Sequence, residues 1–162
     1  RRGDRIYVTG TLGGSLAGKH LTFEPRLEEG LWLRESGWAN AMIDISDGLA
    51  TDLRHILDMS GAGAEIEAAA IPISREARAA RRNRTPLEQA LFDGEDFELL
   101  FTVSPDKQKA FESSWQDSFK LPCTPIGFIT GQGRRVILRE ADGARHLLPD
   151  GGFEHFKSMK KT

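Results

Sequence analysis

The chain has 162 residues, enough for one domain with its own hydrophobic core but short for two. Lys and Arg number 22 against 24 Asp and Glu, and this balance gives no reason to expect a nucleic-acid partner or an anionic membrane surface. The apolar runs are too short for a membrane span. The single cysteine, Cys123, excludes an internal disulfide framework and a cysteine-based zinc site, and it favours the reducing cytoplasm.

The order of apolar and turn-forming residues predicts strands that alternate with helices early in the chain and strands joined by hairpins late in it. The first residue is Arg1, and no methionine or export signal precedes it, so we expect the chain to begin partway along a longer protein. The predicted elements are a strand at 5–9, a helix from 15, a helix at 27–38, a strand at 41–45, a helix from 49 to about 60, a strand at 64–67, helices at 74–82 and from 86, a strand at 97–103, a helix from 104, and strands at 124–130, 135–139 and 144–148.

Two of these elements carry specific expectations about burial. Leu27, Leu31 and Trp38 are expected to form the buried stripe of the helix at 27–38. The run from Ala41 to Ile45 is nearly all apolar, which is typical of a central strand covered on both faces. Together the elements predict an α+β fold, an α/β sandwich with a mixed sheet and helices packed mainly on one face.

A first cluster of candidate functional residues lies where the strand at 41–45 meets the next helix. Asp44, Ser46 and Asp47 place two carboxylates and a hydroxyl in this junction. An acid inside the apolar run would lose its hydration, so Asp44 is expected to have a partner or a metal ion. Carboxylates are suitable ligands for Mg²⁺, and phosphate oxygens of a substrate usually complete the coordination shell of this ion. Asp47 has a simpler alternative as the cap of the following helix.

A second acidic cluster precedes the strand at 97–103. Asp93 and Glu98 are expected to be solvated, as acidic residues in turns usually are, whereas Glu95 and Asp96 are left open. The remaining motifs give weaker evidence of function. The glycine-rich stretch at 9–18 lacks the register of a dinucleotide-binding or phosphate-binding loop. The arginines at 75–84 fit a solvated helix face, and His55 lies on the polar face of its helix with no evident role.

The two acidic clusters resemble thiamine-monophosphate kinase, a member of the ATP-dependent superfamily that includes aminoimidazole ribonucleotide synthetase and selenophosphate synthetase. The similarity lies in Met42 to Leu49 and Gly94 to Phe101, supported by Gly3 to Gly10 and by Gly152 to Phe156. Residues 1–162 resemble the C-terminal half of that kinase as one domain. The N-terminal half, which carries much of the ATP site and the dimer interface, has no counterpart here.

The resemblance implies a role for particular residues. Asp44 and Asp47 would be magnesium ligands, and Ser46 would contact ATP. Glu95 would contact thiamine monophosphate, and Phe153 would lie against the same substrate, with Phe156 as an alternative aromatic. The implied fold is that of the C-terminal domain of aminoimidazole ribonucleotide synthetase. No residue is expected to act as a catalytic acid or base.

The resemblance also implies a reaction, the ATP- and magnesium-dependent phosphorylation of thiamine monophosphate to thiamine diphosphate. The full-length enzyme is expected to be a cytoplasmic homodimer that binds no nucleic acid or membrane, and the fragment alone is expected to be inactive. Three alternatives remain: another enzyme of the same superfamily, a non-catalytic nucleotide- or partner-binding module, and a short-chain dehydrogenase. The last is weak because Tyr7, the only tyrosine, lies in the first strand.

Overall fold

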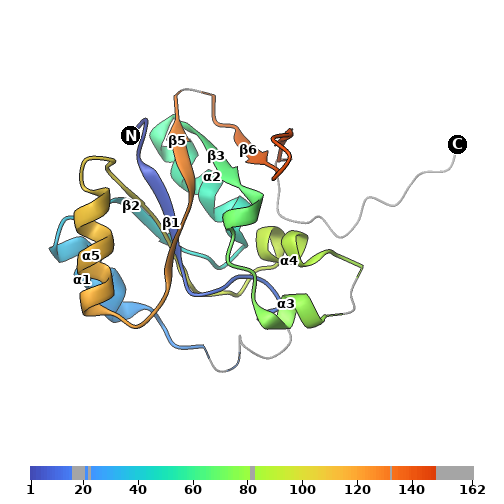
Figure 1. The fold of residues 1–162 in the computed structure, drawn as a ribbon, viewed down its shortest axis with the longest axis horizontal. Coiled ribbons are helices and arrows are strands. Elements are labelled where there is room, and N and C mark those ends of the chain that lie inside the picture. Colours follow the sequence, from blue (N-terminus) through green and yellow to red (C-terminus); the bar gives the residue numbers. More distant parts are fainter. Residues whose placement is uncertain (16–20, 22, 81–82, 132, 149–162) are drawn as a thin grey trace, which may run out of the picture.

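The protein is described by a computed structural model that covers residues 1–15, 21, 23–80, 83–131 and 133–148 (Figure 1). The helix predicted from residue 15 falls mostly on residues 16–20, outside this part of the chain. The elements are β1 (Arg5–Thr9), α1 (Leu27–Glu35), β2 (Ala39–Asp44), α2 (Leu49–Ser60), β3 (Gly63–Glu67), the 3₁₀ turn η3 (Ala68–Ala70), α3 (Arg75–Ala79), α4 (Pro86–Phe92), β4 (Leu99–Val103), α5 (Gln108–Ser118), β5 (Cys123–Thr130), β6 (Val136–Arg139) and β7 (Arg145–Leu147).

The strands form one mixed sheet in the order β2-β4-β1-β5-β3-β6-β7. All neighbouring strands are antiparallel except β3 and β6, which are parallel. The turn at 142–143 joins β6 to β7 as a hairpin, as predicted. The predicted hairpin at 131–133 is wrong, because β3 pairs with both β5 and β6 and lies between them.

The sheet is apolar on both faces, and each face has its own hydrophobic core. On β1, Ile6 and Val8 belong to one core, which α2 and α4 cover, while Tyr7 points into the other. That second core is largely aromatic and includes Phe111 and Trp115 of α5. Figure 1 shows α1 and α5 together on one side of β1, away from α2, α3 and α4. The α+β class and the mixed sheet agree with the prediction, whereas the helices, which were expected mainly on one face, divide between the two faces because each face has its own core.

Helix α1 buries a different stripe from the predicted one. Leu33 is fully buried in the aromatic core, whereas Leu27 is 76% exposed and Leu31 is 49% exposed. Trp32 of the same helix packs edge-on against Trp115 at a centroid distance of 5.8 Å. The helix therefore meets the core along a different face from the one that Leu27 and Leu31 occupy.

Strand β2 lies at the edge of the sheet, so the prediction of a central strand covered on both faces is wrong. Its residues alternate between half-buried and exposed, and Met42 is 38% exposed. An edge strand with one open face gives this period of two, although the sequence of this strand is almost continuously apolar. Within the described residues, no helix is both long enough and apolar enough to cross a membrane.

Candidate functional site at the ends of β2 and β4

The first cluster forms a tight strand-turn-helix connection. Beyond Asp44, the backbone N–H of Ile45 still donates to the carbonyl of Glu98 at 2.8 Å, and α2 then begins at Leu49. Gly48 is the N-cap with φ 102°, and a Cβ there would lie 3.2 Å from the Asp93 carbonyl oxygen. Glycine therefore serves both the left-handed conformation and the close approach of a second segment. Asp47 does not cap α2, which removes the simpler alternative for this side chain.

The side chains of this turn face outward. Asp44 and Asp47 are exposed and Ser46 is half-buried. The expectation that Asp44 loses its hydration on folding is wrong, because it lies on the open face of an edge strand. Neither carboxylate forms an ion pair with an arginine or lysine in the described part of the chain, so both are available to a ligand.

The second cluster lies directly against the first. The backbone N–H of Glu95 donates to the carbonyl of Ser46, and that of Phe97 donates to the carbonyl of Ile45, both at 2.8 Å. Glu95 and Phe97 have φ values of 64° and 52°, a left-handed conformation that costs free energy in residues with a side chain. The antiparallel pairing of β2 with β4 thus continues past both strands and brings the exposed Glu95 beside the turn that carries Ser46 and Asp47.

Two acids of the second cluster are buried, which corrects the expectation that they are solvated. Asp93 is 5% exposed and pairs with Arg84, which therefore is not part of a solvated face. Glu98 is 1% exposed and accepts two hydrogen bonds from the Arg26 guanidinium, at 2.8 and 3.0 Å. The Thr9 hydroxyl donates to the same carboxylate at 2.8 Å. Ion pairing compensates for the lost hydration of both acids.

Asp96 anchors the glycine-rich segment. Its carboxylate is 1% exposed and accepts the backbone N–H of Gly13 at 2.9 and 3.0 Å, as well as the Ser15 hydroxyl. Gly13 has φ 82°, and a Cβ there would lie 2.7 Å from the backbone nitrogen of Ala90 in α4. The glycines in this segment thus allow close packing against helices, which agrees with the absence of a dinucleotide-binding register.

Two residues near the turn have no role in the sequence-based prediction. Asp52 of α2 is 1% exposed, and its Oδ2 accepts the backbone N–H groups of Ser46 and Asp47, each at 3.0 Å. The pKa of Asp52 is raised above its ordinary value, chiefly because burial disfavours the charged form and also because of the Asp47 charge, while the hydrogen bonds from the two N–H groups partly oppose the shift. Ligand atoms of Asp47, Asp52 and His55 lie within 4.8 Å of one another, so His55, to which the sequence assigned no role, lies beside the acidic turn.

The residues present fit a hard divalent cation. Exposed carboxylates such as Asp44 and Asp47 provide the oxygen ligands that Mg²⁺ prefers, with room for water and substrate oxygens. Among the residues that the structure describes, the side chains whose ligand atoms lie close enough to share one ion are those of Asp47, Asp52 and His55, and Asp44 is not in this group. Phe153 and Phe156, predicted to contact substrate, lie outside the described residues.

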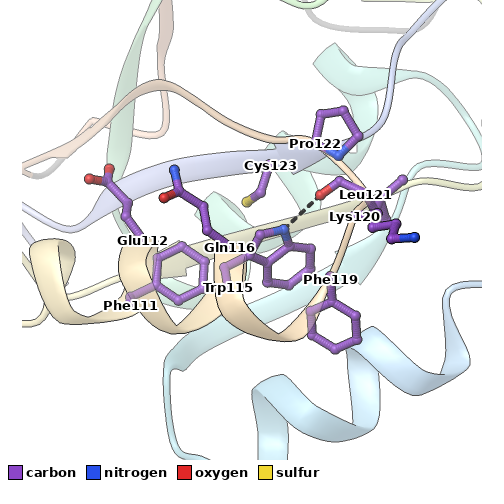
Figure 2. A pocket seen from close by; sticks show the side chains of 9 residues that line it. All are labelled: Phe111, Glu112, Trp115, Gln116, Phe119, Lys120, Leu121, Pro122 and Cys123. Atoms are coloured by element: carbon purple, nitrogen blue, oxygen red, sulfur yellow. Dashed lines mark hydrogen bonds between the residues drawn. The ribbon is translucent and has the colours of Figure 1, made fainter.

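A separate hollow of about 300 Å³ lies between α5 and the segment that leads into β5 (Figure 2). Trp115 forms part of its wall and donates its indole N–H to the Leu121 carbonyl at 2.8 Å. Cys123 also lines it, and burial raises the pKa of this thiol. None of the residues that line this hollow belongs to either acidic cluster, so it is distinct from the candidate site.

Comparison with known proteins supports the resemblance to thiamine-monophosphate kinase that the sequence suggested. Thiamine-monophosphate kinase from Rhodopirellula baltica is 45% identical over 132 residues, 80% of this chain and 41% of the relative. The crystal structure of thiamine-monophosphate kinase from Stenotrophomonas maltophilia K279a superposes with a TM-score of 0.72 at 33% identity, over 88% of this chain and 51% of the other. A structure of AaThiL complexed with AMPPCP and TMP superposes with a TM-score of 0.65 at 32% identity, over 96% of this chain and 52% of the other.

The chain spans about half the length of the curated relatives that it matches. The family described as AIR synthase related protein, C-terminal domain, matches residues 1–139. That range contains both acidic clusters and all of the strands up to β6. By this match, the chain belongs to the family of AIR synthase related protein C-terminal domains.

Proposed function

We propose that this chain is the C-terminal domain of an enzyme that transfers the γ-phosphoryl group of ATP to thiamine monophosphate, forming thiamine diphosphate and ADP. The observation that carries the proposal is the hydrogen bond from Glu95 to Ser46, which joins the two acidic clusters into one exposed surface. The relatives at 45% and 37% identity are named for this activity, and one structural neighbour is a complex with AMPPCP and TMP.

The roles proposed for the individual residues are those that the sequence resemblance implies, and the exposure of the described ones is compatible with them. Asp44 and Asp47 would hold Mg²⁺, which when bound supplies positive charge against the phosphate groups of both substrates. Ser46 is a half-buried residue of the same turn, and its side chain would contact ATP. Glu95 is exposed on the adjoining loop and would orient the thiamine phosphate. Phe153 would pack against the acceptor, a role that rests on sequence resemblance alone.

The chemistry of this transfer suits a surface of carboxylates without a general base. The acceptor is already a phosphate oxygen, so no strong base is needed to remove a proton from it. Catalysis then depends on holding two anions in line and offsetting their repulsion. The rigid connection at 44–48 and the paired loop at 93–98 would fix the ligand-bearing side chains before substrate arrives.

The direct test uses the full-length protein as its gene encodes it. With ATP, Mg²⁺ and thiamine monophosphate we expect thiamine diphosphate to form, and with residues 1–162 alone we expect none. A panel of acceptors related to the other superfamily members would identify a different substrate. Tight magnesium-dependent ATP binding without transfer to any acceptor would instead indicate a binding module and refute the proposal.

We further infer that the full-length enzyme is a cytoplasmic homodimer that does not act on nucleic acids or membranes. The free thiol of Cys123 agrees with a reducing compartment. The near-neutral charge balance gives no electrostatic reason for binding polyanions. The dimer rests on resemblance alone, and light scattering of the full-length protein would test it.

A further inference from the structure

We propose that Asp52 is a positioning residue that fixes the turn bearing Ser46 and Asp47 without itself touching substrate. This inference rests on the proposed function, because it assigns Asp52 to the same surface. Its basis is the pair of hydrogen bonds that run from the backbone of the turn back to one carboxylate oxygen inside the first turn of α2.

Asp52 closes the turn from two directions. Its own backbone N–H donates to the Gly48 carbonyl at 3.0 Å, as expected for the start of a helix. Its side chain reaches further back, and Oδ2 accepts from Ser46 and Asp47 at 3.0 Å each. Two consecutive peptide groups are therefore held to a side chain that the rigid helix carries. These groups flank the α-carbons from which the candidate ATP and metal contacts extend.

The position of Asp52 is costly for an acid. The residue is 1% exposed, and its neighbours Leu49, Leu53 and Ile56 are part of a hydrophobic core. An apolar residue would fill this position without losing hydration. The free energy spent on a buried carboxylate is offset by the two backbone N–H donors and by the positive end of the helix dipole. What the acid provides beyond stability is a defined main-chain geometry for the turn.

The rival explanation is that Asp52 binds the metal directly, since its ligand atom lies within 4.8 Å of those of Asp47 and His55. The geometry offers a way to separate the two roles. Both hydrogen bonds end on the same oxygen, so the single amide oxygen of Asp52→Asn can accept both of them. Asn retains the positioning contacts but removes the negative charge, which should weaken any direct binding of Mg²⁺ by this side chain. Asp52→Ala removes the hydrogen bonds and the charge together.

The experiment compares Asp52→Asn, Asp52→Ala and a control, Leu57→Ala, in the full-length protein. Leu57 is fully buried in the same helix, towards the end of the helix that lies away from the turn. Its truncation should lower the free energy of unfolding by about 2–5 kcal/mol without removing a hydrogen bond to the turn. The readouts are kcat and KM for both substrates, the Mg²⁺ concentration at half-maximal rate, and hydrogen exchange of peptides that cover residues 45–48.

We expect Asp52→Ala to lower kcat roughly 10- to 100-fold, as loss of an outer supporting contact typically does, and to speed exchange at 45–48. Asp52→Asn is expected to restore both values, and Leu57→Ala to leave kcat unchanged. An Asn variant as defective as Ala, with a raised Mg²⁺ requirement, would show direct ligation and overturn the proposal. So would equal kcat losses in Asp52→Ala and Leu57→Ala. If the wild-type protein lacked kinase activity, the proposed function would fail, while the exchange rates would still decide whether Asp52 holds the turn.

Discussion

Replacing Gly94 by alanine tests whether the contact between the two acidic clusters matters. A Cβ at this position would lie 2.5 Å from the backbone oxygen of Ser46, and Gly94 is not among the residues with positive φ. Alanine can therefore adopt the local backbone conformation, and the contact with Ser46 is the main obstacle. Since ordinary contacts begin at roughly 3.5 Å, the two loops must separate by about 1 Å.

The expected consequences of that separation differ in size. Overpacking and stretching of the Glu95 to Ser46 hydrogen bond should lower the free energy of unfolding by about 1–3 kcal/mol. Misplacement of catalytic contacts by about 1 Å can cost on the order of 100-fold in turnover. The assay pairs urea denaturation with steady-state kinetics of the full-length protein. Gly131→Ala is the matched control, because a Cβ there would lie 4.0 Å from the nearest atom, in the Arg2 side chain. Wild-type stability and turnover in Gly94→Ala would refute the argument.

Three further predictions address single groups. Asp47→Asn should lower turnover by roughly 100-fold or more while changing the free energy of unfolding by less than about 0.5 kcal/mol, because the side chain is exposed. A variant with a lowered melting temperature and normal kinetics would contradict this. Thr85→Ala should lower the free energy of unfolding, measured by urea denaturation, by about 1 kcal/mol, because Thr85 and Glu88 form a capping box at α4. The hydrogen bonds from Thr85 lower the pKa of Glu88 in the folded chain. The stability that Glu88 contributes is therefore present above its pKa in the unfolded chain and is lost as the pH falls through its pKa in the folded chain; the same pH dependence in Thr85→Ala as in the wild type would contradict this. Because burial raises the pKa of Cys123 and depletes its thiolate, a thiol reagent at pH 8 should react far more slowly with the native chain than with the urea-unfolded chain, and equal rates would be inconsistent with the burial.

Local sequence signals predicted several elements well. The apolar period of 3.6 placed α2, and Gly61 ends it in a left-handed conformation with φ 62°, as expected for a C-cap. Pro86 begins α4 at its first turn, and the Ser74 hydroxyl caps α3 by accepting a hydrogen bond from the Ala77 N–H. These features depend on residues a few positions apart, so the sequence contains the information directly.

Burial of the acids could not be predicted in the same way. Glu98 is compensated by Arg26, 72 positions earlier in the chain, and no local pattern connects them. The exposure of Asp44 depends on β2 being an edge strand, a property of strand order and not of its own composition. Asp52 stands within an apolar helical stripe, and that unusual placement is the one signal that could have marked it.

The proximity of the two clusters follows from the register of one strand pair. Asp44 lies opposite Leu99, so the chain that leaves β2 must run beside the chain that enters β4. A shift of two residues would keep each side chain on its face but move the partners apart by about 6.6 Å, at roughly 3.3 Å per residue. Glu95 would then lie beyond hydrogen-bond reach of Ser46. The alternation of half-buried and exposed side chains on β2 disfavours odd shifts, and the hydrogen bonds of Ile45 and Phe97 fix the pairing beyond the strands. Hence the stability of the β2–β4 pair and the geometry of the proposed site depend on the same contacts, and a substitution that loosens this register should impair both together.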